Sequence, residues 1–447
     1  QRDHASVQHL VNKVGGTLLG VLSVLCVIGV LASPVLVTIF APGFLYRDPA
    51  QFELAALMLR LTFPYLLFIS LVAFAAGILN TYGRFAAASF VSVWLNVVLI
   101  GAAILVSPHL AQPELALAAG VFVAGVVQVL FLVPSLKRIG LFPRPSWGRQ
   151  DAGVRRIMKL KLPGILGSSV AQINLLFDTL IASFLVAGSV SWLYYSDRLV
   201  EFPLGVFAIA LSTVILPSLS RSHANDSVDE FSHTVDWALR MVLLIGIPSA
   251  VGLLLLARPM LVTLFNYGDF GAADVDMAGL SLMAYAVGLP GFMLVKVLAP
   301  AFYSRKDTTT PVRIAIAALL TNIVLNLLFV VPMVMLDIPG PHAGLALATS
   351  LAAWVNAGLL FHVLKKKQVY RPEPGWPRLF MQLGSAALAL AAVLILGMPS
   401  LQAWLEWSAW SRVTGLLVWV LAGVASYFIA LRVCGLRIKT LLQQRQD

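Results

Sequence analysis

The chain has 447 residues, of which 59% are hydrophobic and only 11% are charged, and its mean hydropathy is +0.89. Soluble domains carry about 25% charged residues, so this composition excludes a soluble globular protein and predicts a membrane protein with many spans. A net charge of +11 also fits a nucleic-acid-binding protein, a class that the distribution of the basic residues excludes.

Twelve apolar segments of about 20 residues follow one another along the chain. Hydrocarbon offers the backbone no hydrogen-bond partners, so spanning segments must be helices or closed barrels. The segments lack the period-2 alternation of barrel strands, and we expect helices. The expected spans are 14–40, 53–80, 88–107, 114–134, 162–187, 192–217, 236–265, 276–303, 311–336, 342–364, 379–397 and 411–433.

Lysine and arginine are concentrated in alternate loops and the span ends that border them. These segments hold 24 of the 31 basic residues. The positive-inside rule places them in the cytoplasm, together with both ends of the chain. The basic excess therefore orients the protein and contacts anionic membrane lipids, and no nucleic-acid partner is expected.

An internal repeat is visible in two short motifs. Residues 32–40 read "ASPVLVTIF" and residues 257–265 read "ARPMLVTLF", with six of nine positions identical; stretches ending at Asn96 and Asn322 align at nearly the same spacing. Both copies of the first motif close a span of the same direction, which predicts a parallel repeat. In the second half, spans 162–187 and 192–217 stand before the helix that carries the motif, whereas only residues 1–13 stand before it in the first half. If the halves are equivalent, the intact protein has fourteen spans, and we expect the first two to be absent from this chain.

The expected fold is thus an all-α polytopic membrane protein with two parallel six-helix lobes and two further C-terminal helices. The expected organisation is a four-span N-terminal lobe (1–134), a basic cytoplasmic linker (135–161), a six-span C-terminal lobe (162–364), a second linker (365–378), the two extra helices (379–433) and a cytoplasmic tail (434–447).

Parallel halves around a central site are typical of alternating-access transporters. An integral-membrane enzyme, such as a polyprenyl-linked sugar transferase, would need a reactive constellation. The sequence shows no Asp-rich metal motif, no paired His pattern and no Gly-rich phosphate loop. A scaffold role has no positive feature, and charges inside spans argue against it.

One span carries Asp197, Arg198 and Glu201 within five residues. An arginine near the bilayer centre costs about 2.5–3.5 kcal/mol on insertion scales. Either the three charges neutralise one another as a structural group, or Arg198 faces a hydrated cavity and binds an anion, for which a guanidinium fork suits phosphate.

A second polar group combines Asn174 and Asp178 in one span with Asn322 and Asn326 in another, each pair four residues apart. Carboxylate and amide oxygens would suit a Na⁺ site, a proton-coupled site or an interhelical hydrogen-bonded cluster. Charges closer to span ends, such as Arg240, are expected to snorkel to the interface.

Three stretches carry a family resemblance: "GSVSWLYYSDRLVEFPLGVFAIALSTVILPSLS" (188–220), "VKVLAPAFYSRKDTTTPVRIA" (295–315) and "FPYLLFISLVAFAAGILNTYGRF" (63–85). They resemble the MurJ (MviN) family of bacterial lipid II flippases, members of the multidrug/oligosaccharidyl-lipid/polysaccharide exporter superfamily. The resemblance implies fourteen helices in two lobes around a cationic cavity, and transport of undecaprenyl-diphosphate-linked peptidoglycan precursor to the outer leaflet of the inner membrane by alternating access. It implies no enzyme activity.

The resemblance also implies roles for residues. Arg198, with Asp197 and Glu201, would bind the diphosphate, and spans 379–397 and 411–433 would form a groove for the lipid tail. Other cavity arginines of the family lie on its first two helices, which are expected to be absent here.

Some members of the family bind Na⁺, and Asp178, Asn322 and Thr349 match ligands of that site. Asn326 stands where those members have Asp, so the site here would carry one negative charge fewer. Apart from Na⁺, the resemblance implies no cofactor. Cell-wall synthesis or division proteins are candidate partners. The alternatives within transporters are another polyprenyl-diphosphate oligosaccharide flippase and a cation-coupled multidrug exporter.

Overall fold

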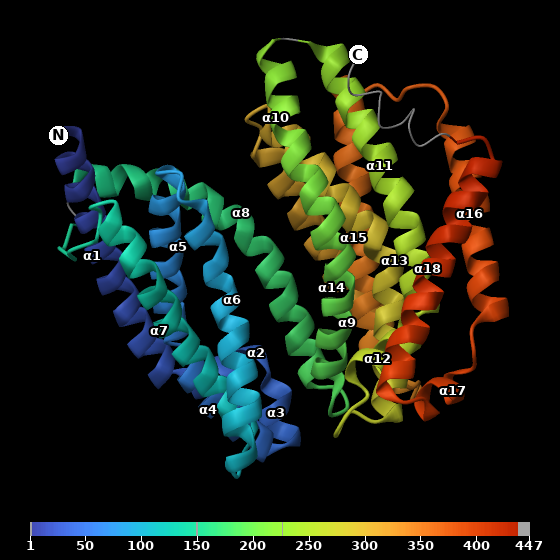
Figure 1. The fold of residues 1–447 in the computed structure, drawn as a ribbon, viewed down its shortest axis with the longest axis horizontal. Coiled ribbons are helices and arrows are strands. Elements are labelled where there is room, and N and C mark those ends of the chain that lie inside the picture. Colours follow the sequence, from blue (N-terminus) through green and yellow to red (C-terminus); the bar gives the residue numbers. More distant parts are fainter. Residues whose placement is uncertain (1, 149–150, 226, 437–447) are drawn as a thin grey trace. The chain divides into compact units, whose positions relative to one another are not determined.

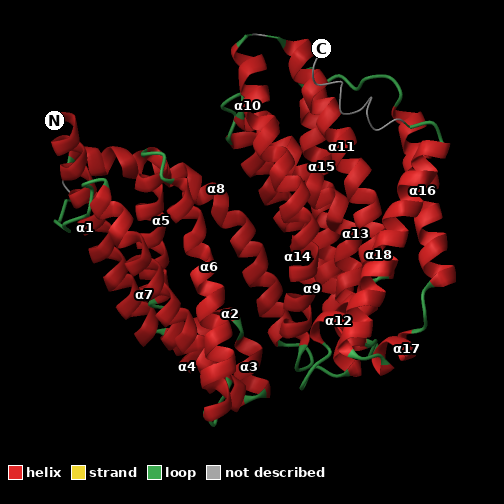
Figure 2. Cartoon of the chain, in the orientation of Figure 1, coloured by secondary structure: helices red, strands yellow, loops and turns green. Residues whose placement is uncertain are grey.

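The structure is a computed structural model that describes residues 2–148, 151–225 and 227–436, without the side chains of 2–4 and 158–171. All regular elements of these residues are helices (Figure 2). Eleven helical segments among them are long and apolar enough to cross a membrane. The prediction of an all-helical, multi-span protein is therefore confirmed. The remaining expected span, 162–187, falls on helix α8 (Ala152–Ser183), partly where side chains lie outside the described residues.

The chain forms two compact units, Gln1–Ser168 and Ser169–Asp447 (Figure 1). The α-helices that lie wholly within the first unit are α1 (Arg2–Leu31), α2 (Ser33–Phe40), α3 (Pro42–Arg47), α4 (Pro49–Thr62), α5 (Tyr65–Thr81), α6 (Phe85–Gly101) and α7 (Glu114–Arg138). Helix α6 continues through a π-helical turn (Ala102–Val106) into a 3₁₀ turn (Ser107–His109). Helix α8 begins in this unit and ends in the second.

The second unit holds the longer helices. They are α9 (Ser189–Pro203), a π-helical turn η3 (Leu204–Ile209), α10 (Ala210–Ala224), α11 (Val228–Leu255), α12 (Ala257–Phe265), α13 (Ala272–Tyr303), α14 (Thr309–Met335), α15 (His342–Lys366), α16 (Trp376–Gly397), α17 (Leu401–Glu406) and α18 (Ala409–Val433). Helices α16 and α18 pack against each other, and α16 also packs against α11.

The repeated motif occupies matching elements in the two units. It forms α2, directly after the break that ends α1, and α12, directly after the break that ends α11. Pro34 and Pro259 lie just inside these short helices. Because proline has no backbone N–H to donate to the preceding turn, the long helix ends before each of them. Asn96 and Asn322 then lie on α6 and α14. The order α1–α2, α4–α5, α6, α7 therefore parallels α11–α12, α13, α14, α15.

Helix α13 is the centre of the second unit and packs against α9, α11 and α15. Small side chains allow this close approach. A Cβ at Gly288 would lie 2.5 Å from the Ser350 hydroxyl oxygen, and the Ser196 hydroxyl of α9 lies 2.8 Å from both the Ala278 carbonyl oxygen and the Ser281 hydroxyl. Small residues with interhelical hydrogen bonds are the usual means of packing helices in lipid.

A buried arginine fastens the C-terminal helices to α12. Arg412 is 8% exposed. Its guanidinium donates to four backbone carbonyl oxygens, those of Trp404 (3.1 Å), Leu405 (2.8 Å), Val262 (3.4 Å) and Asn266 (3.2 Å). The positive charge thus satisfies the free carbonyls at the ends of α12 and α17 instead of pairing with a carboxylate.

Replacing Arg412 with Met should lower stability, because it leaves several buried carbonyls without a donor. We expect a loss of about 2–4 kcal/mol, the range for breaking charged hydrogen bonds at a buried site, measured by thermal unfolding of the purified protein in detergent. Arg432→Met removes the same charge from an exposed position on the same helix and should change the unfolding midpoint little. Equal midpoints for both variants would contradict the anchoring role.

Candidate functional site

Helix α9 has one buried face and one charged, exposed face. Leu193, Ser196 and Val200 are buried against the unit core, whereas Tyr194, Arg198 and Glu201 are exposed. At 3.6 residues per turn, positions 194, 198 and 201 lie on one side of the helix. The charges noted in the sequence therefore form a stripe on the face that the second unit leaves uncovered.

Arg198 is held by its neighbours on this stripe. Its Nη1 donates to Glu201 Oε2 at 2.7 Å, its Nη2 lies 3.9 Å from Asp197 Oδ2, and its guanidinium stacks over the Tyr194 ring at 5.0 Å. The side chain nevertheless remains 51% exposed. The carboxylates thus offset the charge and orient the fork, and part of the guanidinium remains exposed. Binding of an anion by its remaining N–H groups stays a prediction.

The stripe ends where the helix changes geometry. Pro203 closes α9 and is followed by the π-helical turn η3. Proline supplies no N–H to the preceding turn, and π-helical turns inside α-helices occur frequently at functional sites. Nothing lies within 4 Å of a Cβ built at Gly205 in this turn. The exposed face of α9 therefore continues into an uncrowded segment.

The predicted polar cluster is assembled from three helices. Asp178 of α8 is 6% exposed. It accepts hydrogen bonds from Asn326 Nδ2 of α14 at 2.7 Å and from the Thr349 hydroxyl of α15 at 3.0 Å. Asn322 Nδ2 donates to the Thr349 hydroxyl at 2.9 Å, and Asn174 Nδ2 lies 3.4 Å from Asp178 Oδ2. The structure thus brings together all the residues that the sequence singled out for this group.

The donor set of this cluster fits a small hard cation. It combines one carboxylate, one hydroxyl and three amides, and oxygen ligands are what hard cations prefer. The Oδ1 atoms of Asn326 and Asn174 are buried and accept no hydrogen bond within the described part of the chain. These two oxygens are therefore free to coordinate a cation. Asp178 makes no salt bridge to any described residue, so one positive charge would neutralise the cluster.

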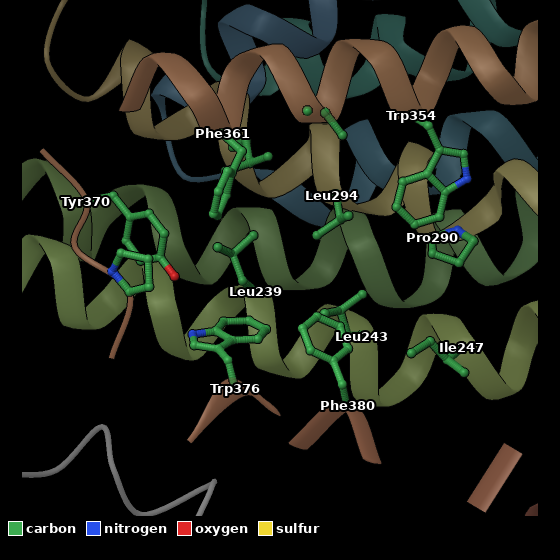
Figure 3. A pocket seen from close by; sticks show the side chains of 14 residues that line it. Leu239, Leu243, Ile247, Pro290, Leu294, Trp354, Phe361, Tyr370, Trp376 and Phe380 are labelled. Atoms are coloured by element: carbon green, nitrogen blue, oxygen red, sulfur yellow. The ribbon is translucent and has the colours of Figure 1, made fainter. Parts of the chain in front are cut away.

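An apolar cavity of about 510 Å³ lies elsewhere in the second unit (Figure 3). Leu239 and Leu243 of α11, Leu294 of α13 and Phe361 of α15 form its walls, and its remaining side is closed by residues 370–380. The sequence placed a groove at 379–397 and 411–433. Of these, only Phe380 lines this cavity, which α11, α13 and α15 complete.

A buried carboxylate holds the α15–α16 linker against this cavity. Asp236 of α11 is fully buried and accepts from Tyr370 Oη at 2.6 Å, Trp376 Nε1 at 2.8 Å, the Glu373 backbone N–H at 3.2 Å and Arg240 Nε. Two of these donors, Tyr370 and Trp376, also line the cavity. The linker is therefore positioned by one carboxylate that four donors satisfy.

The snorkelling expected for Arg240 is wrong. Arg240 is buried, pairs with Asp236, donates to the Pro374 carbonyl oxygen at 3.1 Å and lies over the Trp376 ring at 5.1 Å. The i,i+4 spacing to Asp236 was a usable signal in the sequence. The linker partners were not, because they lie more than 130 residues further along the chain.

Metal centres of the usual protein type are missing from the part of the chain that the structure describes. No group of three or more His, Cys, Asp or Glu side chains there could hold a metal ion. The Asp178 cluster, with a single carboxylate, is of a different kind.

Comparison with known proteins gives consistent matches. The profile of the family described as "Lipid II flippase MurJ" matches residues 1–416. The chain is 46% identical over 445 residues to a probable lipid II flippase MurJ of Vibrio cholerae, covering 98% of this chain and 83% of the relative. It is 42% identical over 398 residues to the lipid II flippase MurJ of Burkholderia cenocepacia, covering 88% and 76%.

Solved structures share the fold. An inward-closed lipid II flippase MurJ superimposes with a TM-score of 0.76 at 24% identity, covering 95% of this chain and 83% of that one. An inward-facing multidrug transporter of the MATE family and the MOP superfamily gives a TM-score of 0.64 at 16% identity, covering 81% and 86%. The chain therefore shares its fold with these two transporters.

Replacing Asp236 with Ala should loosen the linker and destabilise the protein, because the variant leaves the buried Arg240 charge without its partner. We expect a loss of about 3–5 kcal/mol in thermal unfolding, and faster hydrogen exchange in residues 370–376. Asp229→Ala, at an exposed position on the same helix, should stay within about 0.5 kcal/mol of the parent protein. Unchanged linker exchange in Asp236→Ala would contradict the role of this carboxylate.

Proposed function

The chain belongs to the MurJ family of lipid II flippases, and on that premise we propose that it moves lipid II across the bacterial inner membrane. Lipid II is the undecaprenyl-diphosphate-linked disaccharide-pentapeptide used in peptidoglycan synthesis. Transport would run from the cytoplasmic to the outer leaflet by alternating access, with parallel helical repeats moving around a central site. The protein is a transporter in this account, with no chemical step.

The half-exposed Arg198 stripe is the observation that carries the proposal. A charged stripe on a span is expensive in lipid, so its exposed face calls for water or a charged ligand. Arginine binds phosphate oxygens through two parallel N–H bonds. Glu201 and Tyr194 hold the fork from one side, which reduces the entropy that binding would otherwise cost. A lipid-linked diphosphate fits this arrangement.

The lipid tail needs an apolar surface, and the 510 Å³ cavity supplies one. Its walls are leucine and aromatic side chains of α11, α13, α15 and α16, and apolar contact contributes about 25 cal/mol per Å². Lipophilic drugs also bind in apolar cavities of this volume. What favours a polyprenyl diphosphate over a drug is the presence in one unit of both this apolar surface and an arginine suited to phosphate.

The topology that belongs to this proposal places the basic loops and both ends of the chain in the cytoplasm. The loop charge asymmetry supports this orientation. The basic side would then meet anionic headgroups of the inner leaflet, where lipid II is made. Cell-wall synthesis or division proteins are the partners that such an activity calls for.

We assign the Asp178 cluster to Na⁺ binding as part of the same proposal. The ion would be held by side-chain oxygens of Asp178, Thr349, Asn322 and Asn326. The oxygen of Asn326 would be its Oδ1, which has no hydrogen-bond partner among the described residues. The bound ion would supply the charge that the cluster lacks. Since it would join α8, α14 and α15, its binding would couple to movements among these helices.

Arg198→Ala should abolish transport while leaving the protein inserted and folded, because its guanidinium is half exposed and carries little core packing. The measurement is lipid II exposure on the outer leaflet after depletion of the endogenous flippase, with rescue by the gene that contains this chain. Arg258→Ala, which breaks another partly exposed arginine pair with Asp276, is the matched control and should rescue. Rescue by Arg198→Ala would overturn the assignment.

Na⁺ should raise the unfolding temperature of the purified protein relative to choline at equal ionic strength, because a ligand that binds only the folded state stabilises it. Asp178→Asn and Thr349→Val should each reduce this Na⁺-specific shift, and Asp229→Asn should leave it intact. A shift of the same size in choline, or one that persists in Asp178→Asn, would remove Na⁺ from the account.

A further inference from the structure

A second, polar cavity of about 200 Å³ lies where three connecting segments of the second unit meet. It is lined by the end of α10, the start of α11, the α13–α14 turn and the α15–α16 linker. Its volume is below the 300–1,000 Å³ of drug-sized pockets and several times that of a water molecule. None of the described residues that line it belongs to α8 or α9, and none of them is a member of the Arg198 stripe or the Asp178 cluster.

Among the residues that the structure describes, the side chains that line this cavity are basic, hydroxyl, amide or apolar. Arg305, Lys367 and His223 lie on its wall beside the hydroxyls of Ser222 and Ser227, and no described Asp or Glu lines it. The Ser227 hydroxyl oxygen accepts the Glu230 N–H, which leaves its own proton to donate. The Ser222 hydroxyl already donates to the Ser218 carbonyl oxygen at 3.1 Å. The wall therefore presents hydrogen-bond donors from four other polar side chains, Arg305, Lys367, His223 and Ser227.

One acidic residue stands nearby and is already occupied. Asp307 accepts hydrogen bonds from the Thr310 hydroxyl at 2.7 Å and from Lys367 Nζ at 3.0 Å. Partial burial raises the pKa of Asp307, but the bonds from Thr310 and Lys367 outweigh it and hold the pKa below the usual carboxyl range. Asp307 thus stays charged and uses one of the three Lys367 donors, and the other two remain.

Arg305 has no such partner. Its side chain forms no hydrogen bond or ion pair with any residue that the structure describes, although its backbone is fixed in the turn by the bond from its N–H to the Phe302 carbonyl oxygen at 3.0 Å. A guanidinium fork on a fixed turn, facing a cavity with further donors, is suited to an anion with several oxygens. Phosphate offers three strong acceptor oxygens.

We propose that this cavity binds a phosphate group, supplied either by the headgroup of an anionic lipid or by a free phosphate in solution, and that Arg305 is its principal ligand. The site is distinct from the transport site and would act on it through the linker. Val369 lines the polar cavity, and the next residue, Tyr370, lines the 510 Å³ apolar cavity. A phosphate held by Lys367 would therefore fix the segment that closes the end of the apolar cavity.

The test uses the full chain in nanodiscs of phosphatidylcholine without lipid II, and measures hydrogen exchange in residues 367–376. Inorganic phosphate is added in one arm, and phosphatidylglycerol is included in the bilayer in another. Sodium chloride at matched ionic strength is the salt control. We expect slower exchange with at least one phosphate source. Slowing by inorganic phosphate identifies free phosphate, and slowing by phosphatidylglycerol alone identifies the headgroup.

In Arg305→Gln, the phosphate concentration needed for half-maximal slowing of exchange should rise about tenfold, the fold-change of one lost charge-assisted hydrogen bond. Arg313→Gln removes an equal charge from the first turns of α14, away from the cavity lining, and should retain the effect. Lys367→Gln is unsuitable because it also breaks the Asp307 bond. No slowing in either arm, equal slowing in sodium chloride, or full slowing in Arg305→Gln would overturn the proposal without touching lipid II transport.

Discussion

Hydrocarbon gives a polar or charged side chain no partner, and the second unit is organised by how each buried charge meets this constraint. Arg412 is satisfied by backbone carbonyls at helix ends, and Asp236 by four donors that include Arg240. Asp178 is satisfied by amides and a hydroxyl alone. Arg198 is satisfied only in part and stays half exposed. The first two groups are closed and structural, whereas the last two keep capacity for a ligand.

This graded satisfaction connects architecture to transport. Closed groups fasten α18 to α12 and α17, and α11 to the α15–α16 linker that closes one side of the apolar cavity. Open groups lie on α8, α9, α14 and α15. A transporter needs closed groups to keep its helices together and open groups to bind a ligand. Binding can shift a conformational equilibrium only where the ligand's contacts differ between the two states.

The sequence predicted the elements well and the partnerships less well. Apolar length identified eleven of the spans. The recurrence of "ASPVLVTIF" as "ARPMLVTLF" predicted a repeat in which each copy closes a continuous span, and the structure instead places the copies on separate short helices, α2 and α12. The i,i+4 spacing of Asn322 and Asn326 placed both amides on one helix face, where the structure finds them beside Asp178. Such patterns are local, and helix geometry fixes their consequences.

Long-range partnerships could not be predicted in this way. Nothing near Arg240 or Asp236 indicates that Tyr370 and Trp376 will cover them, and the sequence therefore predicted a snorkelling arginine. The family resemblance implied a lipid-tail groove on spans 379–397 and 411–433, which stays a prediction, whereas the apolar cavity formed by faces of α11, α13 and α15 was not expected from the sequence. Which apolar face meets which neighbour depends on tertiary packing, and all faces of a membrane helix are apolar enough to be candidates.

The central claim is that the exposed face of α9 meets water and lipid II rather than hydrocarbon. Its direct test is labelling by a membrane-impermeant, water-soluble maleimide in a chain that carries Cys26→Ser and Cys434→Ser. Tyr194→Cys, beside Arg198 on this face, should be labelled and should be protected by lipid II, whereas Leu388→Cys on the exposed surface of α16 should stay unlabelled. An unlabelled Tyr194→Cys, or labelling that lipid II leaves unchanged, would contradict the account.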